Sequence, residues 1–241
     1  MDIKISDYNP LWPNIFEQEA SKIKQALRKC KLYHIGSTSV PNLASKPIID
    51  IIAEVNDITL ADVLLTQIGY RYKGEYNLPL RRLYDKSGKI YLHVHKTGSP
   101  EIESNLVFRD YLRQNKGARD EYAALKIELA KDRANAQKAP TGITKYNLGK
   151  HQFIADVLNK AEFRGLCVRF VSCEQEYYYN MTHIFPDDAS CKHFVLYEGA
   201  KLIAAACLKI QGNHASIIAA KGKNLNYLLK FILKWWGAIT N

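Results

Sequence analysis

The chain has 241 residues, of which 47% are hydrophobic and 24% are charged. This composition excludes a disordered or membrane-embedded chain, and the length favours one large domain with a smaller one. There are 34 lysines and arginines against 24 aspartates and glutamates, so the formal net charge is +10. A basic surface attracts nucleic acid or small phosphorylated substrates, but it equally serves solubility.

No stretch of the sequence predicts a membrane span or a secretory signal. The longest uninterrupted apolar stretch, 202–208, is far shorter than the roughly 20 residues that cross a bilayer. The N-terminus is acidic and polar, unlike a signal peptide. We therefore expect a cytoplasmic protein with no membrane partner. Five scattered cysteines without a Cys-x-x-Cys pair are interpreted as reduced, mostly buried thiols: Cys30, Cys167, Cys173, Cys191 and Cys207.

In the first two thirds of the chain, a helix is followed by several short strands. Helical spacing of apolar residues alternates with β-branched runs, and the runs end at glycines or polar loops. The second strand carries only two acids, Asp50 and Glu54, in an otherwise apolar run. The predicted order is a helix over 12–29, strands over 32–35 and 48–55, a helix over 59–68, and short strands near Tyr70, Arg82 and Tyr91.

Helical spacing returns over 105–158, with a break at the Ala-Pro-Thr-Gly run 139–142. A second unit is predicted from about residue 162, with strands over 166–171, 194–198, 201–210 and 215–219 and helices over 174–184 and 224–236. The fold class is therefore α/β (α+β). A mixed sheet flanked by helices is expected over 1–161, and a smaller α/β unit over 162–241.

A Gly-Ser turn and a single strand carboxylate carry the chemistry of the first unit. Twelve residues separate Ser37 from Asp50. Turn amides and hydroxyls hold phosphates, glycine lets the backbone approach them, and strand carboxylates hold magnesium. We expect Asp50 to be catalytic and a metal ligand, although a plain tight turn and a salt bridge of Asp50 are the alternatives. The expected phosphate contacts are Gly36, Ser37, Thr38, Ser39, Lys46 and Arg82.

The string HIGSTSVPNLASKPIIDII, residues 34–52, resembles the signature of the GrpB family. Further matches are YNPLW at 8–12, LHVH at 92–95, FRDYLR at 108–113 and YAALK at 122–126, so the resemblance covers about residues 5–160. It implies a nucleotidyltransferase-like fold of the polymerase-β superfamily. It also implies a bound nucleoside triphosphate, magnesium or manganese, and an acceptor that the sequence does not identify.

One position departs from the pattern of active polymerase-β-like enzymes. These enzymes carry a second acid two residues after the first, where this chain has Ile52. His93 and His95 share one face of a later strand, and an imidazole there would complete a site with Asp50. Histidine suits manganese or zinc better than magnesium, so both histidines are candidate metal ligands. Their alternative role is that of hydrogen-bonded structural residues.

Several arginines are further candidates for phosphate binding. Arg81 and Arg82 follow Pro79 at a predicted strand, and neighbouring strand residues face opposite sides, so at least one of the two is expected to face solvent. Arg109 and Arg113 share a helix face at a spacing of four. They either line the cleft or pair with Asp110 and other acids.

The C-terminal segment has the order of the first part of a GNAT-type acetyltransferase, with the hairpin VLYEGAKLIAAACLKI. The glycine-rich pyrophosphate loop of that family is absent from 220–226, so acetyl-CoA is not expected as a cofactor. Trp235 and Trp236 either form an apolar face for a partner or close the core of this unit. Four lysines form either an anion-binding or a solvated face: Lys221, Lys223, Lys230 and Lys234.

Two functions fit these features best. The first is a metal-dependent nucleotidyltransferase-like enzyme with an unknown small or macromolecular acceptor. The second is a catalytically inactive nucleotide- or phosphate-binding module with a degenerate acetyltransferase-like appendage. Nucleic-acid binding rests on charge alone, because no aromatic-basic motif accompanies it. A homo-oligomer is compatible with the sequence.

Overall fold

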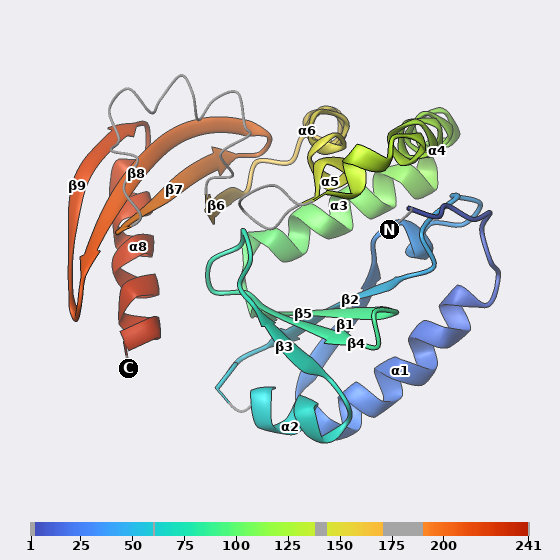
Figure 1. The fold of residues 1–241 in the computed structure, drawn as a ribbon, viewed down its shortest axis with the longest axis horizontal. Helices are drawn as coiled ribbons and strands as arrows, with labels where there is room; N and C mark the ends of the chain where they lie inside the picture. The colour runs from blue at the N-terminus through green and yellow to red at the C-terminus, as the bar shows by residue number, and fades with distance from the viewer. Residues whose placement is uncertain (1–2, 60, 138–143, 171–189, 241) are drawn as a thin grey trace.

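The described residues form two β-sheets, whose arrangement is drawn in Figure 1. The computed structural model describes residues 3–59, 61–137, 144–170 and 190–240. The predicted mixed sheet flanked by helices is confirmed, and so is a second sheet in the C-terminal region. Within the described ranges, no helix is both long and apolar enough to cross a bilayer.

The first sheet has the strand order β1-β2-β5-β4-β3. Only the β2–β5 pair is parallel, so the sheet is mixed. Its elements are α1 (Trp12–Leu27), β1 (Cys30–Ile35), the 3-10 turn η1 (Ser37–Ser39), β2 (Ile49–Val55), α2 (Ala61–Gln67), β3 (Arg71–Gly74), β4 (Arg82–Lys86) and β5 (Ile90–Lys96). The helices that follow are α3 (Pro100–Gln114), α4 (Lys116–Lys131), the 3-10 turn η2 (Arg133–Ala136), α5 (Lys145–Leu148) and α6 (His151–Lys160).

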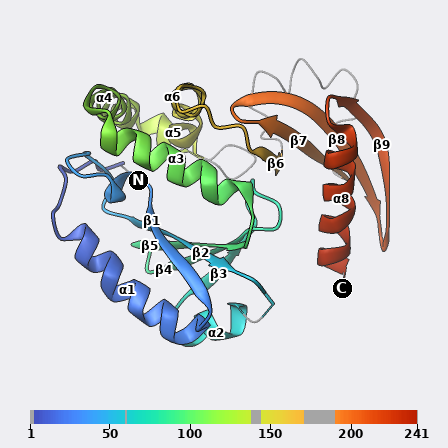
Figure 2. The same ribbon diagram turned by 180° about the vertical axis from the view of Figure 1, so that it is seen from behind.

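The two faces of the first sheet are covered by different helices. Ile49 and Ile51 of β2 pack with residues of α1 and α2 in the main core, whereas Ile52 packs with Ile102 of α3. Figure 2 shows α1 and α2 on one side of this sheet and α3 on the other. Because successive strand residues point to opposite faces, Asp50 shares the α3 side with Ile52.

The second sheet is an antiparallel meander in the order β6-β7-β8-β9, with α8 against one face. Trp235 is 3% exposed and packs with Leu228 and Ile232 between α8 and the sheet. The two tryptophans therefore help to close this unit's own core, since Trp236 also packs against it. The elements are β6 (Leu166–Phe170), β7 (Cys191–Glu198), β8 (Lys201–Gln211), β9 (His214–Gly222) and α8 (Leu225–Thr240).

Polar contacts join the two units. The guanidinium of Arg169 on β6 pairs with Glu101 on α3, with Nε 3.0 Å from Oε1. The indole N–H of Trp235 donates to Oε2 of Glu75, which lies in the loop between β3 and β4, at 2.9 Å. Removal of one partner of a buried ion pair is strongly destabilising, so Arg169 and Glu101 link the second sheet to helix α3 of the first unit.

Most sequence predictions of elements are confirmed within a few residues. The helical region begins at Pro100 rather than near 105, because Ser99 is the N-cap and proline suits the first helical turn. The helix predicted over 174–184 lies outside the described residues. The GNAT-like character of the second unit stays a prediction.

Candidate phosphate-binding site

The turn after β1 lies directly against Asp50. Ile35 and Asp50 are partners in the antiparallel β1–β2 pair. Gly36 follows with φ +69, and a Cβ at that position would lie 2.5 Å from Oδ2 of Asp50. Glycine is required at position 36 for two reasons. Other residues rarely adopt this φ, and the Asp50 carboxylate occupies the space that a side chain would need.

Thr38 and Ser39 stabilise the turn from within. The Thr38 hydroxyl donates to the carbonyl of Ile48 at 2.9 Å, and the Ser39 hydroxyl donates to the carbonyl of Gly36 at 2.6 Å. Because the one Thr38 hydrogen is used, Nε2 of His34 is the donor of its 3.1 Å bond to Thr38 Oγ1. Both hydroxyls are buried, so these side chains shape the turn and are not available to a ligand.

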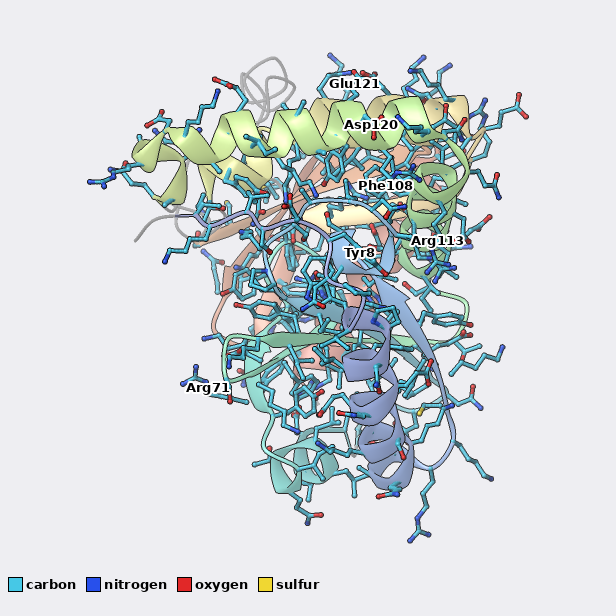
Figure 3. The ribbon with its side chains drawn as sticks, turned by 90° about the vertical axis from the view of Figure 1, so that its right-hand side faces the viewer. Tyr8, Arg71, Phe108, Arg113, Asp120 and Glu121 are labelled. Carbon is cyan, nitrogen blue, oxygen red and sulfur yellow. The ribbon has the colours of Figure 1, made fainter. Side chains whose placement is uncertain are left out.

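Two arginines of α3 fix the backbone on either side of the turn. Arg113, labelled in Figure 3, donates through Nε and Nη2 to the carbonyl of Ser39 at 3.0 and 2.8 Å. Arg109 donates to the carbonyl of His34 at 3.0 Å. Both also pair with Asp110. Their pairing with Asp110 is thus confirmed, and their further role is to hold the turn.

A cavity of about 260 Å³ opens beside Asp50 and the turn. Its polar lining comes from six places: η1, the segment before β2, strands β2 and β5, helix α4 and the α5 region. The lining residues are Ser37, Ser45, Lys46, Ile48, Asp50, Tyr91, Lys126, Tyr146, Asn147 and Lys150. The predicted residues Ser37, Lys46 and Asp50 are therefore brought together around one space.

Three lysines give this cavity its positive charge. Lys126 is 2% exposed, and its ammonium group donates to the carbonyl of Ala44. Burial and the charge of Lys150 lower the pKa of Lys126 to about 7. Burial and the charge of Lys46 lower the pKa of Lys150 to about 8, although Asp50 opposes the shift. A bound anion would favour the charged form of both amines.

The ring of Tyr146 holds two of these lysines in place. The Nζ atoms of Lys46 and Lys150 lie 4.3 and 4.6 Å from its centroid. Tyr146 is 1% exposed, and burial raises the pKa of its hydroxyl to about 12, so the ring stays neutral. Cation–π contacts of this kind hold ammonium groups without neutralising them. The positive charges are thus positioned before any ligand arrives.

Asp50 has a second neighbour in His93 on β5. Nε2 of His93 lies 3.5 Å from Oδ1 of Asp50, and Nη1 of Arg81 lies 3.3 Å from Nδ1 of His93. A guanidinium has no acceptor, so Nδ1 of neutral His93 accepts and Nε2 carries the hydrogen. Burial lowers the pKa of His93, which favours this neutral form. His93 therefore presents a donor to Asp50.

The residues around the cavity offer too few ligands to coordinate a divalent cation without a bound nucleotide. Among the described residues that line the cavity, Asp50 is the one carboxylate, and Ile52 is fully buried. His93 has no lone pair to offer a metal while Arg81 donates to it. Magnesium needs several oxygen ligands, so a magnesium or manganese ion would depend on oxygens of a bound nucleotide.

His95 and Arg82 are not brought to the cavity. Nδ1 of His95 lies 3.3 Å from the hydroxyl of Ser99, and burial lowers its pKa to about 3. Arg82 pairs with Asp62 on α2 and lies over the ring of Tyr72. It faces the α2 side because strand neighbours alternate. Arg81, which is 6% exposed, faces His93 instead, and Arg82 is the more exposed of the two.

Comparison with known proteins extends this picture. The model of the GrpB protein family matches residues 2–160. The chain belongs to the GrpB family. The crystal structure of the conserved protein GrpB from Enterococcus faecalis has 38% sequence identity and a TM-score of 0.57, and the match covers 66% of this chain and 96% of that one. The GrpB resemblance seen in the sequence is thus confirmed.

Two curated relatives of this GrpB family chain carry the name UPF0157 protein. UPF0157 protein YqkA of Bacillus subtilis is 37% identical over 160 residues, which are 63% of this chain and 45% of YqkA. UPF0157 protein BH1888 of Halalkalibacterium halodurans is 38% identical over 135 residues, which are 53% of this chain and 69% of the relative. The match therefore spans less than half of YqkA, and residues beyond 160 lie outside the family match.

Sequence reasoning missed Lys126, Lys150 and Tyr146. Lys150 and Tyr146 follow the undescribed segment 138–143, and nothing in their spacing distinguishes them from surface residues. Lys126 did carry a signal, because it stands four residues after the buried Tyr122 on the apolar side of α4. A lysine placed within an apolar stripe is costly to bury, so it marks either a site or an internal contact.

Proposed function

We propose that this GrpB family chain binds the phosphate groups of a nucleoside triphosphate in the Asp50 cavity. The observation that carries the proposal is the convergence of Lys46, Lys126 and Lys150 on one space beside the glycine turn. Burial and the charge of a neighbouring lysine lower the pKa values of two of these amines, Lys126 and Lys150. A polyphosphate anion would relieve the cost of their charged forms, since charge-assisted contacts to phosphate are strong.

The size of the cavity favours the phosphates rather than the whole nucleotide. Pockets that enclose a drug-sized ligand measure about 300–1,000 Å³, whereas this cavity measures about 260 Å³. The base and sugar would lie outside it. Because nucleoside triphosphates are made and used in the cytoplasm, the proposal agrees with the cytoplasmic location predicted from the sequence.

Nucleotidyl transfer is the second candidate function. It is favoured by Asp50, whose Oδ1 lies 3.5 Å from Nε2 of His93 while its Oδ2 lies against the glycine turn. In such a reaction an acceptor hydroxyl oxygen would bond to the α-phosphorus, the bond to the β-phosphate oxygen would break, and pyrophosphate would leave. Asp50 would take the hydroxyl proton as general base. The polymerase-β-like layout of the sequence is consistent with this role.

Calorimetric titration with ATP, GTP, CTP and UTP, without metal and with magnesium or manganese, tests the binding. We expect the wild-type chain to bind, and Lys150→Gln to weaken binding about tenfold or more, since a hydrogen bond to a charged group contributes about 1.5–3 kcal/mol. The matched control is Lys145→Gln, because Lys145 is exposed and does not line the cavity. If the folded wild type binds no nucleotide under any condition, the proposal is wrong.

Asp50→Asn distinguishes the two candidate functions. If the cavity only holds phosphates, removal of the carboxylate removes a like charge, so metal-free affinity rises. If Asp50 takes part in a metal-assisted transfer site, the variant loses the component of affinity that magnesium or manganese adds. Parallel titrations of both proteins, with and without metal, measure each component.

A further inference from the structure

A second group of ligand-type side chains lies on the C-terminal sheet. Cys191 and His193 are two residues apart on β7, and Cys207 is on the neighbouring strand β8. His193 and Cys207 are register partners in the antiparallel pair. Residues at this spacing share one face of a sheet. Three side chains from two paired strands therefore project to the same side.

The potential ligand atoms of these three residues converge. One atom from each, the two Sγ atoms and a ring nitrogen, lie within 4.8 Å of one another. Ligand atoms around a four-coordinate zinc stand about 3.3–3.8 Å apart, because Zn–N is about 2.0–2.1 Å and Zn–S about 2.3 Å. Side-chain rotations that move the ligand atoms by roughly 1 Å would bring them to the separations expected around zinc. Regular strand pairing already fixes the backbone positions.

We propose that Cys191, His193 and Cys207 form a zinc-binding site. Two thiolates and an imidazole are the donors that zinc prefers over hard cations such as magnesium. Three protein ligands leave the fourth tetrahedral position to water or another donor. Cys207 is fully buried, while Cys191 and His193 are partly exposed. The metal would thus lie at the surface of the sheet with a path for entry.

This site is independent of the Asp50 cavity. Its residues lie beyond 160, outside the GrpB family match, and on the other sheet. The sequence alone does not indicate the site. Cys191 and His193 form a Cys-x-His pair, and Cys207 follows fourteen residues after His193, which is not the spacing of a known zinc-binding motif. Strand pairing brings the third ligand into place.

Cobalt titration of the 241-residue chain tests the site. The protein is reduced, stripped of metal with a chelator and titrated with Co²⁺, followed by displacement with Zn²⁺. We expect the sulfur-to-cobalt charge-transfer absorption and the strong visible bands of tetrahedral cobalt, saturating at one equivalent and disappearing when zinc is added. Zinc should also raise the melting temperature, because it binds the folded state.

Variants assign the ligands. Cys191→Ser, Cys207→Ala and His193→Gln should each lose the cobalt bands and the zinc-dependent rise in melting temperature. Cys30→Ser on β1 is the matched control and should keep both. Cys207 is buried, so its substitution could unfold the chain. His193 is partly exposed, and His193→Gln then still tests the site in a folded protein. Absence of thiolate bands in the reduced wild type, or their persistence in folded His193→Gln, would overturn the proposal.

Discussion

Gly36→Ala is expected to destabilise the first unit and to abolish nucleotide binding. The added Cβ would lie 2.5 Å from Oδ2 of Asp50, and alanine would be forced to φ +69. Strain of this kind costs about 1–3 kcal/mol, and displacement of the carboxylate adds to it. The turn would move away from Asp50, and Ser37 would leave the cavity with it. Denaturant unfolding and nucleotide titration measure the two effects.

Gly117→Ala is the control for this substitution. A Cβ at Gly117 on α4 would meet no atom within 4 Å. Alanine in a helix is more stable than glycine by about 0.5–1 kcal/mol, so this variant should be at least as stable as the wild type and bind normally. Equal stability and equal affinity of Gly36→Ala and wild type would show that the turn tolerates a side chain.

Nucleotide affinity is expected to fall steeply as pH rises from about 7 to 9. The pKa values of Lys126 and Lys150 are lowered to about 7 and about 8, so both amines lose protons in the free protein over this range. An anion binds best when both are charged, and each binding event above neutral pH takes up protons. The expected decrease is tenfold or more, since one pKa unit corresponds to about 1.4 kcal/mol. Titrations in buffers of different ionisation enthalpy measure the uptake.

The stability of the ligand-free chain should change with the opposite sign. A lysine whose pKa is lowered by folding binds fewer protons in the native state than in the unfolded one. The free energy of unfolding therefore rises with pH between about 7 and 10. Lys126→Met should flatten this rise and reduce the pH dependence of binding, whereas Lys145→Gln should change neither. A pH-independent affinity would contradict the lowered pKa of Lys126.

The sequence predicted the elements around the site better than the site itself. Gly36 and Asp50 could be identified because each differs from the residues around it. Gly36 follows the end of a predicted strand, and Asp50 is an acid within an apolar run. Local patterns also located β1, β2 and the helices. The lysines of α4 and the α5 region could not be assigned, because their approach to Asp50 depends on how helices far along the chain fold back over the turn.

Arg81 and Arg82 show a second limit of sequence reasoning. Strand alternation correctly placed them on opposite faces, but it did not say which face holds the site. The pairing of Leu83 with His93 fixes that choice, and it assigns Arg82 to α2 and Asp62. Register between strands depends on tertiary packing, so the alternation pattern alone could not say that Arg82 lies on the α2 side.

The loop between β3 and β4 connects the C-terminal unit to Asp50. Trp235 of α8 donates to Glu75, and Phe170 of β6 donates through its amide to the carbonyl of Asn77. Arg81, at the end of the same loop, donates to the carbonyl of Glu75 and contacts His93. Removal of the C-terminal unit would therefore leave the Asp50 side chain in place but free the loop that fixes the His93 tautomer. The C-terminal unit thus reaches Asp50 through a continuous chain of polar contacts, from Glu75 to Arg81 and from Arg81 to His93.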